Sequence, residues 1–293
     1  MADEHEELQY LKIVRKAIDK GEMREDRTGV GTKALFGEVM RFSLENGTMP
    51  LFTTKRTYWS GIARELLWFL SGSTDSKELE ANGVTIWRGN TSKEFLEKKN
   101  LGHYQEGDIG PGYGFQWRHW GAEYEGCASD YTGKGFDQIS AAINSILKNP
   151  TDRRILVSSW NPTAIPQMAL PPCHYSFQFF VHVETKELSC MMNQRSADLG
   201  LGVPFNVASY ALLTHIVAHV CGLKARSLVH VMGDCHVYLN HVEPLERQLA
   251  REPFQFPTLE ITKETTNIDE IKFEDLQLTN YKCHSAIKME MAI

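Results

Sequence analysis

Several common functional signals are missing from this 293-residue chain. There is no Gly-x-x-x-x-Gly-Lys-Ser/Thr phosphate loop, and Gly29 and Gly31 form a pair without the third glycine of a dinucleotide fingerprint. The pair also lacks the strand, turn and helix that such a fingerprint needs around it. The sequence therefore argues against a P-loop nucleotide site and against NAD(P) as a cofactor.

Cysteine is scarce, and its spacing argues against two further classes. The six cysteines are spread from Cys127 to Cys283 without the spacing of a disulfide framework, so we expect reduced thiols. Some precede a histidine directly, as in Cys173-His174, but adjacent residues on a strand point to opposite faces. The Cys-x2-4-Cys and His-x3-5-His spacings of structural zinc sites are absent, so we expect no metal.

Basic residues do not predominate in the sequence. The chain has 31 Lys and Arg against 37 Asp and Glu, which gives a net charge of -6. This balance gives no electrostatic basis for nonspecific binding of nucleic acid. We expect no DNA partner, while a specific interaction with RNA stays open. Because the net charge is negative, an anionic ligand would have to be bound by a local group of arginines.

A basic leader and long apolar runs are also missing. Residues 1–7 are acidic and polar, unlike a secretory signal or a transit peptide. We expect no apolar run to approach the length of a membrane span, and hence no membrane partner. The expected compartment is the cytosol, with the nucleus as the alternative.

The remaining composition is typical of one large globular unit. Hydrophobic residues make up 42% and charged residues 23%, and no repeat or linker divides the chain, so we expect a single domain over residues 1–293. Irregularly alternating strands and helices favour an α/β (α+β) fold with a large mixed β-sheet flanked by helices. Predicted helices cover residues 8–21, 58–70, 136–147, 206–222 and 240–250, predicted strands cover 35–44, 153–157, 173–183, 187–193, 227–232 and 254–262, and a surface insert covers 77–107.

The most informative stretch is Pro171-Pro172-Cys173-His174, just before an apolar run. Proline fixes φ and cannot continue a β-ladder, so both prolines should lie at the entry of a strand rather than in its middle. A thiol at this point is pre-positioned for chemistry. The competing interpretation is a buried cysteine that packs as a small hydrophobic residue.

Arginines in separate segments indicate a phosphate group. Arg27 lies in a Gly/Thr loop, Arg153 and Arg154 lead a predicted strand, and Arg195-Ser196 follow another. The forked guanidinium suits phosphate oxygens, and a serine hydroxyl adds a donor. Each arginine alone could be a solvated surface residue. As a set beside Cys173 they indicate a phosphorylated small molecule.

A few further polar and aromatic residues stand out. Glu65 lies within an apolar helix, where an unpaired carboxylate is costly, so we expect it to be partnered or catalytic. Asp198 and Asn206 offer hydrogen bonds suited to the edge of a heterocycle, although Asn206 could instead be a helix N-cap. Trp87 and Phe205 fit either the core or a stacking surface.

These segments together resemble the thymidylate synthase family along nearly the whole chain, with inserts more like those of animal than of bacterial members. So many ordered matches are more specific than any one of them. The matching stretches are Asp26-Arg27-Thr28-Gly29, Thr53-Thr54-Lys55-Arg56, Glu65-Leu66-Leu67-Trp68-Phe69-Leu70, Thr85-Ile86-Trp87, Gly114-Phe115-Gln116-Trp117-Arg118, Asp152-Arg153-Arg154, Pro171-Pro172-Cys173-His174, Gln194-Arg195-Ser196, Gly200-Leu201-Gly202-Val203-Pro204-Phe205-Asn206, Gly233-Asp234-Cys235-His236-Val237-Tyr238 and Met291-Ala292-Ile293.

The resemblance implies methyltransferase activity: dUMP and 5,10-methylenetetrahydrofolate give dTMP and dihydrofolate. It implies catalytic roles for Cys173, Glu65, Tyr113, His174, Asn206 and Asp198. The dUMP site that it implies consists of Arg27, Arg153, Arg154, Cys173, His174, Gln194, Arg195, Ser196, Asp198, Asn206, His236 and Tyr238. The folate site that it implies consists of Lys55, Ile86, Trp87, Asp198, Leu201, Gly202, Phe205, Ala292 and Ile293.

The resemblance further implies a homodimer in which Arg153 and Arg154 reach the phosphate site of the partner. Within each site, a thiolate of Cys173 would add to C6 of uracil, and the charge of Arg195 would favour the thiolate. Lys55 would face the anionic tail of the folate. The C-terminal residues would close over the site and exclude water.

The sequence departs from the family pattern at a few positions. Arg88 stands where aspartate is usual, Gly112 replaces a larger residue, and Asn193 stands where tyrosine is usual. Cys283-His284-Ser285 replaces Pro-His-Pro. None of these removes a catalytic atom, but Arg88 and Gly112 put the folate affinity in question.

Three alternative functions stay open at this point. A dUMP or dCMP hydroxymethylase on the same scaffold is the nearest, although Asn206 argues against cytosine, since aspartate suits the cytosine edge better. A Cys-His hydrolase would need a positioned base and an oxyanion hole, for which adjacent Cys173 and His174 are poorly placed. A nucleotide- or RNA-binding regulator would bind without turnover.

Overall fold

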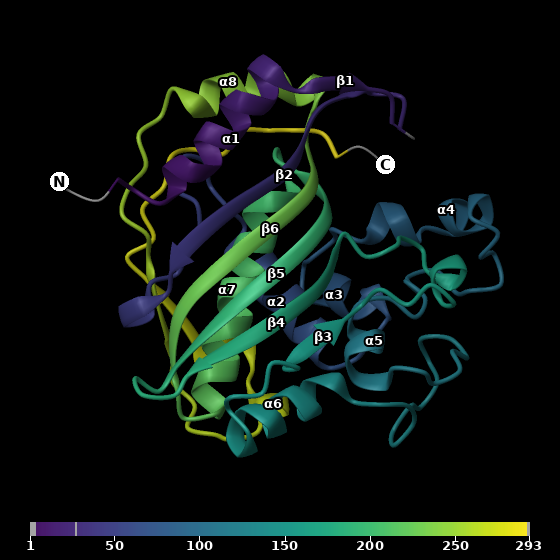
Figure 1. Cartoon of the computed structure of the whole chain (residues 1–293). Coiled ribbons are helices and arrows are strands. Elements are labelled where there is room, and N and C mark those ends of the chain that lie inside the picture. Colours follow the sequence, from purple (N-terminus) through teal and green to yellow (C-terminus); the bar gives the residue numbers. More distant parts are fainter. Residues whose placement is uncertain (1–3, 27, 292–293) are drawn as a thin grey trace.

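A six-stranded mixed sheet lies at the centre of the computed structural model, which describes residues 4–26 and 28–291 (Figure 1). The strand order is β1-β2-β6-β5-β4-β3, and a two-stranded ribbon of β7 and β8 lies apart from it. The mixed sheet confirms the predicted fold class. The strands are β1 Glu22–Arg24, β2 Thr32–Ser43, β3 Leu156–Ser158, β4 His174–His182, β5 Glu187–Asp198, β6 Lys224–Tyr238, β7 Thr258–Ile261 and β8 Leu276–Thr279.

Helices surround this sheet on one side and along its ends (Figure 1). The α-helices are α1 Glu7–Lys20, α2 Trp59–Leu70, α3 Ser76–Ala81, α4 Lys93–Lys98, α5 Gly114–His119, α6 Gln138–Lys148, α7 Gly202–Val220 and α8 Val242–Leu249. Short 3₁₀ turns cover Glu45–Gly47, Arg88–Thr91, Ile165–Gln167, Leu239–His241, Ile268–Glu270 and Phe273–Asp275. The predicted helices all form, whereas strands β1 and β8 were not expected.

Strands β5 and β6 are the one parallel pair in the described sheet, and α7 forms the crossover between them. Helix α7 is apolar on nearly all sides and its side chains are mostly buried, as expected for a helix enclosed by protein. By length and composition α7 could also span a membrane, which corrects the expectation that no apolar run approaches that length. Since 83% of its apolar window is buried inside the protein, α7 is the core helix here.

Helix α7 begins earlier than predicted. Its first residue is Gly202, so Pro204 lies in the first turn, where its missing N–H removes no helical hydrogen bond. Asn206 is therefore a residue of the second turn and not an N-cap. The carboxylate of Asp198 accepts instead from the backbone N–H groups of Gly200, Leu201 and Gly202 at 2.8, 3.2 and 3.4 Å. The end of β5 thus caps α7.

The two long strands extend well past their predicted ends. Strand β5 continues to Asp198 and β6 to Tyr238, and both additions are rich in polar residues that weaken an apolar strand signal. The parallel register places Asp198 opposite His236 and Ser196 opposite Asp234. Two clusters that are far apart in the sequence therefore meet at one end of the sheet.

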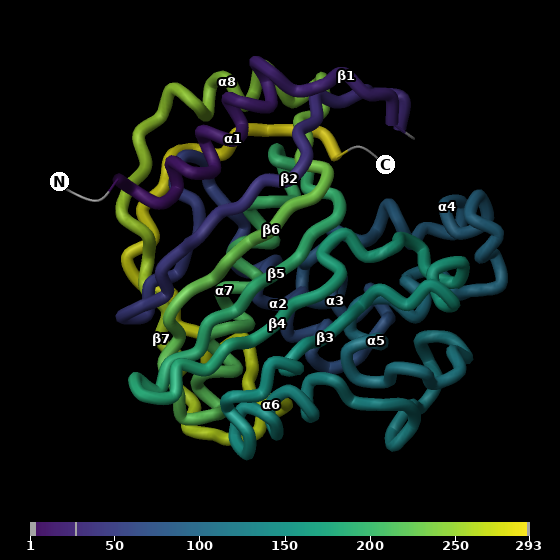
Figure 2. Tube along the Cα trace, viewed as in Figure 1, coloured from purple at the N-terminus to yellow at the C-terminus, as the bar shows by residue number. Residues whose placement is uncertain are grey.

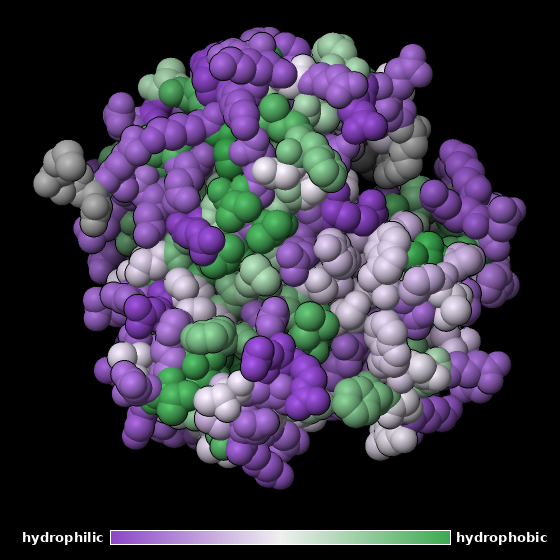
Figure 3. All heavy atoms as spheres, viewed as in Figure 1, coloured by the Kyte–Doolittle hydropathy of each residue, from purple (hydrophilic) through white to green (hydrophobic). Residues whose placement is uncertain are grey.

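The side of the sheet that faces the viewer in Figure 1 is not covered by a helix of the described chain. The tube in Figure 2 shows α7 and α2 behind the strands, on the opposite side. Figure 3 shows apolar side chains gathered over the strands on this open side. Leu156, Val39 and Phe180 are exposed, with 63% of Phe180 accessible. We call this the open face.

A buried carboxylate joins α1 to the loop before α2. Glu7 is fully buried and accepts four hydrogen bonds, from the backbone N–H and hydroxyl groups of Thr53 and Thr54, at 2.6–2.8 Å. Its donors satisfy a charge that would otherwise be costly to bury. This contact fixes the position of the next residue, Lys55.

Candidate active site

Cys173 lies directly before β4, and its backbone is held from two sides. Its N–H donates to the hydroxyl of Tyr113 at 2.9 Å, and its carbonyl accepts from the N–H of Arg195 at 2.9 Å. Pro171 and Pro172 lie outside the strand, as their chemistry predicts. The thiol is thus carried by a rigid strand entry between β5 and the loop before α5.

The guanidinium of Arg195 packs against the same strand entry. Its Nε donates to the carbonyl of Pro172 at 2.8 Å and a terminal nitrogen donates to the carbonyl of Pro171 at 3.0 Å. The ring of Trp160 lies 5.4 Å from the guanidinium carbon. A permanent positive charge is therefore fixed beside the two residues that precede Cys173, which is the charge that a thiolate needs.

A buried acid–base group lies next to Tyr113. The indole N–H of Trp87 donates to Glu65 at 2.8 Å, and the Trp87 and Tyr113 rings are 5.9 Å apart. Burial raises the pKa of Glu65 to about 7, although the Trp87 hydrogen bond opposes this shift. A carboxyl group with this pKa can both donate and accept a proton near neutral pH.

His174 forms the other side of the Tyr113 ring. The two ring centroids are 4.5 Å apart, and Nδ1 of His174 lies 2.9 Å from the hydroxyl of Tyr210. Burial lowers the pKa of His174 to about 3, so the imidazole is neutral at ordinary pH. His174 can thus position a neighbour by hydrogen bonding but carries no charge.

Tyr113 has an unusual backbone conformation for a bulky residue, with φ 35° and ψ -100°. Such a conformation is strained and persists only where the surrounding structure enforces it. The next residue, Gly114, packs so closely that a Cβ there would lie 2.4 Å from the carbonyl oxygen of Phe69. The packing of α5 on α2 therefore enforces the geometry that presents the Tyr113 hydroxyl to Cys173.

Side chains from β5, β6 and α7 complete this end of the sheet. The amide of Gln194 donates to Oδ1 of Asn206 at 2.9 Å. Nδ1 of His236 lies 2.9 Å from the carboxylate of Asp234, and its ring is 5.3 Å from that of Tyr238. The structure thus brings these predicted nucleotide-binding residues to the strand ends that also carry Ser196 and Asp198.

Asp198 is a charged group held by several contacts at the start of α7. Burial alone would raise its pKa, but the nearby His241 and His236 and the Gly200 N–H lower it below the usual range. His241 lies 3.8 Å from this carboxylate, and its other ring nitrogen is 2.7 Å from the carbonyl of Glu290. His241 was not predicted from the sequence, and it joins the C-terminal segment to Asp198.

Lys55 is more buried than its predicted role suggested. Its ammonium donates to the carbonyl of Gly200 and lies 4.0 Å from the sulfur of Met289. Burial lowers the pKa of Lys55 to about 8, against the opposing charge of Asp198. In this conformation Lys55 ties the start of α7 to the C-terminal segment instead of facing solvent.

A partly exposed apolar surface lies around the start of α7. Leu201 and Phe205 are partly buried, and Ile86 and Trp87 pack with Phe205 against the main core. Gly202 offers a Cα without a side chain in this region. These are the residues predicted to contact the flat part of a folate. Arg27, Ala292 and Ile293, predicted for the phosphate and folate sites, lie outside the described residues.

Arg153 and Arg154 do not reach Cys173 of their own chain. The carbonyl of Arg153 accepts from the Gln178 side chain at 3.0 Å, and Gln178 is five residues beyond Cys173 on β4, about 16 Å away. Arg154 is largely exposed and pairs with Asp152 at 2.9 Å. Both arginines therefore lie on the open face rather than in the Cys173 site.

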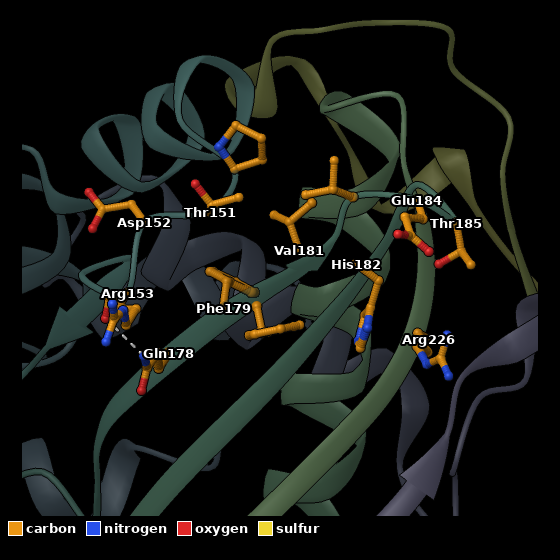
Figure 4. A pocket seen from close by; sticks show the side chains of 13 residues that line it. Thr151, Asp152, Arg153, Gln178, Phe179, Val181, His182, Glu184, Thr185 and Arg226 are labelled. Atoms are coloured by element: carbon orange, nitrogen blue, oxygen red, sulfur yellow. Dashed lines mark hydrogen bonds between the residues drawn. The ribbon is translucent and has the colours of Figure 1, made fainter.

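A cavity of about 550 Å³ opens beside Arg153, at the edge of the open face (Figure 4). Figure 4 shows Phe179, Val181 and His182 of β4 and Arg226 of β6 along its wall. A large cavity is often the first candidate for a site. No thiol is among its lining residues, so the nucleophile and its partners place the chemistry at Cys173 instead.

The departures from the family pattern leave the Cys173 site intact. Arg88 pairs with Glu80 at 2.9 Å on the surface, and Asn193 donates to the hydroxyl of Ser176 at 3.2 Å. A Cβ at Gly112 would meet its nearest neighbour, a methyl of Ile109, at 3.6 Å, so an added methyl group would fit there. Nε2 of His284 donates to the carbonyl of Glu252, 2.8 Å away.

Comparison with known proteins identifies the family of the chain. A family model described as thymidylate synthase matches residues 8–293. The thymidylate synthase of Agaricus bisporus is 56% identical over 295 residues, covering 99% of this chain and 100% of that protein. The human thymidylate synthase is 52% identical, covering 99% of this chain and 91% of that protein. The bifunctional dihydrofolate reductase-thymidylate synthase of Leishmania major is 52% identical, and the match covers 99% of this chain and 56% of that protein.

Proposed function

The chain belongs to the thymidylate synthase family, and from this premise we propose how its own residues perform the methylation of dUMP to dTMP. The enzyme is a methyltransferase that uses methylenetetrahydrofolate as its co-substrate. When bound, this folate supplies the one-carbon unit and the hydride.

Cys173 is the proposed nucleophile. Uracil C5 is a poor nucleophile until a thiolate adds to C6, because the new C–S bond moves the electron pair of the C5–C6 double bond toward C5 and O4. The C5 carbon of this enolate can then bond to the one-carbon unit. The fixed charge of Arg195 beside Pro171 and Pro172 supports the thiolate form of Cys173. This juxtaposition is the single observation that carries the proposal.

Glu65 is the proposed proton carrier. Its pKa of about 7 allows it to take up and return protons, and Trp87 holds its carboxyl group near Tyr113. The hydroxyl of Tyr113 accepts from the backbone N–H of Cys173, and the Tyr113 ring lies 5.9 Å from that of Trp87. Glu65 and Cys173 are therefore connected through Trp87 and Tyr113. His174 would orient this group as a neutral imidazole.

The proposed nucleotide site combines Asn206 with the strand ends of β5 and β6. Asn206 would read the uracil edge, while His236 and Tyr238 would hold the deoxyribose hydroxyl. Arg195 and Ser196, with Arg27, would bind the phosphate, placing C6 near the thiol. Gln194 donates to Oδ1 of Asn206 and so helps to hold the Asn206 side chain in place.

The residues at the start of α7 fit a folate. The Asp198 carboxylate can accept hydrogen bonds from a pterin, and the partly exposed Trp87 and Phe205 offer flat apolar surfaces for its rings. His241 and Lys55 contact the C-terminal segment at Glu290 and Met289, which supports the proposal that this segment closes the site against water.

We also propose that the enzyme acts as a homodimer joined through the open face. The exposed apolar residues of this face suit a partner surface, and Arg153 lies beside it. Gln178, which donates to the Arg153 carbonyl, is about 16 Å from Cys173 along β4. Arg153 and Arg154 would then serve the phosphate site of the partner. Mixing Arg153→Ala and Cys173→Ala subunits should restore one complete site and part of the activity, whereas activity that stays absent in the mixture would contradict the shared site.

The decisive test of the reaction is dihydrofolate formation, followed by absorbance with dUMP and methylenetetrahydrofolate. The wild type should form dihydrofolate and dTMP, and Cys173→Ser should form neither. Hydroxymethyl-dUMP as the product would indicate a hydroxymethylase, and ester hydrolysis abolished by Cys173→Ser would indicate a hydrolase. Absence of dihydrofolate from the folded wild type would overturn the proposal. A cytosolic or nuclear location stays a prediction, to be tested by imaging a tagged protein.

A further inference from the structure

Three hydrogen-bonded side chains, those of His230, Gln194 and Asn206, connect the sheet to α7. Nε2 of His230 on β6 lies 2.9 Å from Oε1 of Gln194 on β5, and Nε2 of Gln194 lies 2.9 Å from Oδ1 of Asn206. His230 is fully buried and Gln194 is 3% exposed. We call these residues the amide relay. Its His230 end is not part of the proposed reaction.

A backbone carbonyl fixes the direction of every bond in the amide relay. Gln194 also contacts the carbonyl of Ser196 at 2.9 Å, and a carbonyl can only accept. The Gln194 atom at this carbonyl must therefore be the nitrogen. Its oxygen then faces His230, so Nε2 of His230 must carry the hydrogen.

The hydrogen position on His230 and the orientation of the Asn206 amide follow from the orientation of Gln194. Burial lowers the pKa of His230 to about 3, so its ring is neutral and carries one N–H only. The hydrogen sits on Nε2, and Nδ1 has no hydrogen-bond partner within residues 4–26 and 28–291. At the other end, the second N–H of Gln194 requires an acceptor, so the Asn206 atom facing it is Oδ1. The NH₂ group of Asn206 is therefore turned away from Gln194.

We propose that His230 is a positioning residue that, through Gln194, locks the Asn206 amide in the orientation that selects uracil over cytosine. The proposal rests on the proposed role of Asn206 in reading the base. Uracil presents an oxygen at C4 and an N–H at N3, which match an amide that offers NH₂ and keeps a lone pair on its oxygen. Cytosine presents NH₂ and a bare nitrogen, which would require the amide to turn over.

Turning the Asn206 amide over is opposed along the entire relay. It would place two NH₂ groups against each other unless Gln194 also turned, and a turned Gln194 would set its oxygen against the Ser196 carbonyl. Replacing His230 by an apolar residue removes the donor that holds the Gln194 oxygen. Both amides would then sample the wrong orientation, because a buried acceptor without a donor is costly.

The test compares His230→Leu, His230→Gln and a control, His215→Leu. The glutamine variant keeps an N–H donor at a similar distance from the backbone. His215 is a histidine of α7 that contacts the Thr48 carbonyl at 3.0 Å, away from the relay. The measurement is kcat and KM for dUMP, with the dissociation constants of dUMP and dCMP.

For His230→Leu we expect kcat/KM for dUMP to fall about tenfold and the preference for dUMP over dCMP to fall by a similar factor. His230→Gln should recover most of both, and His215→Leu should leave the preference unchanged. A folded His230→Leu enzyme whose dUMP preference equals that of the wild type would overturn the proposal.

Nitrogen NMR of the wild type gives a second test that needs no variant to fold. The His230 ring should show a protonated Nε2 and a bare Nδ1 from weakly acidic to weakly basic pH. The opposite tautomer, or a ring that gains charge near neutral pH, would contradict the relay. A wild type that forms no dihydrofolate would refute the proposed function, while the tautomer would still report on the relay itself.

Discussion

At the scale of single residues, environment rather than identity decides the chemistry. Glu7 is fully buried and Glu65 partly buried, and Glu7 accepts four hydrogen bonds whereas Glu65 accepts one from Trp87. Burial raises the pKa of Glu65 to about 7. A structural charge and a proton carrier are therefore distinguished by the number of their donors.

Glu65→Gln should change both the pH dependence of catalysis and that of stability. The wild-type pH profile of kcat/KM should show an ionisation near pH 7, which the variant should lose while its rate falls about a hundredfold or more. Because the folded-state pKa is raised above 4.5, the wild type loses stability as pH rises from about 4.5 to about 7. Over that range the unfolding free energy of the variant should gain up to about 3 kcal/mol relative to the wild type.

These effects are checked by initial rates and by urea unfolding across the pH range. Glu45→Gln, at an exposed position, serves as the control and should leave both profiles unchanged. An ionisation near pH 7 that persists in Glu65→Gln would assign the proton transfer to another group.

Gly112→Ala should stabilise the protein. A Cβ would fit at 3.6 Å from Ile109, and the backbone there needs no positive φ, so the gain is the reduced entropy of the unfolded chain, about 0.5–1 kcal/mol. Gly110→Ala is a matched control of opposite sign, since its Cβ would lie 2.1 Å from the Gln167 carbonyl at a φ of +73°. Thermal unfolding of the two variants checks the prediction, which a destabilised Gly112→Ala would contradict.

From residue types and context, Cys173, Glu65 and Arg195 could be predicted as candidates, and the remaining site residues were predicted from the resemblance to the family. The roles of His230 and His241 could not, because each depends on contacts made across the fold. Asn206 shows the limit most clearly: its sequence context suited an N-cap, but α7 begins four residues earlier, and Asp198 accepts from the N–H groups of Gly200 and Leu201. Asp198 was singled out for a heterocycle edge, and its contacts with the start of α7 depend on where that helix begins.

At the scale of elements, the polar ends of β5 and β6 and the start of α7 determine where the site residues lie. Apolar spacing predicts the middle of β5 and β6, whereas their polar ends, which carry Ser196 and His236, are determined by register with each other. Helix α1 also contributes to the site, because Glu7 accepts hydrogen bonds from the loop that leads to Lys55. Elements without a catalytic residue therefore contribute to the geometry of the site.

Glu7→Gln should destabilise the protein by about 2–3 kcal/mol. An amide nitrogen in place of one carboxylate oxygen would face the N–H and hydroxyl groups of a threonine, so buried donors would lose their acceptor. The exposed Glu22→Gln on β1 is the control and should change the unfolding free energy by less than about 0.5 kcal/mol. Urea unfolding that gives equal values for both variants would show that the Thr53 and Thr54 contacts contribute little.

At the scale of the whole molecule, the open face is the surface on which the proposed dimer depends. The mixed sheet was expected from the alternation of helices and strands, but which side stays uncovered depends on where α7 packs. The sequence pattern of β4 shows alternation without showing which set of side chains meets a helix. The proposed dimer therefore follows from the assembled sheet.

Phe180→Glu should separate the proposed dimer into monomers and abolish most dihydrofolate formation. The side chain is 63% exposed, so a single chain should tolerate the charge, whereas burial of a carboxylate between two sheets is costly. Phe136→Glu is the control, since Phe136 is 59% exposed but lies outside the sheet. Sedimentation velocity checks the state of assembly, and a Phe180→Glu protein that sediments and reacts like the wild type would contradict the interface.

The parallel pairing of β5 and β6 also has a consequence for how the enzyme forms. These strands cannot join until α7 has crossed between them, and contacts of such long sequence separation form late in folding. Cys173 precedes β4, Gln194 lies on β5, Asn206 on α7 and His236 on β6, so they meet only when this crossover closes. A refolding chain should therefore regain its helical signal before it regains any activity, and nucleotide binding should report the last step of sheet assembly.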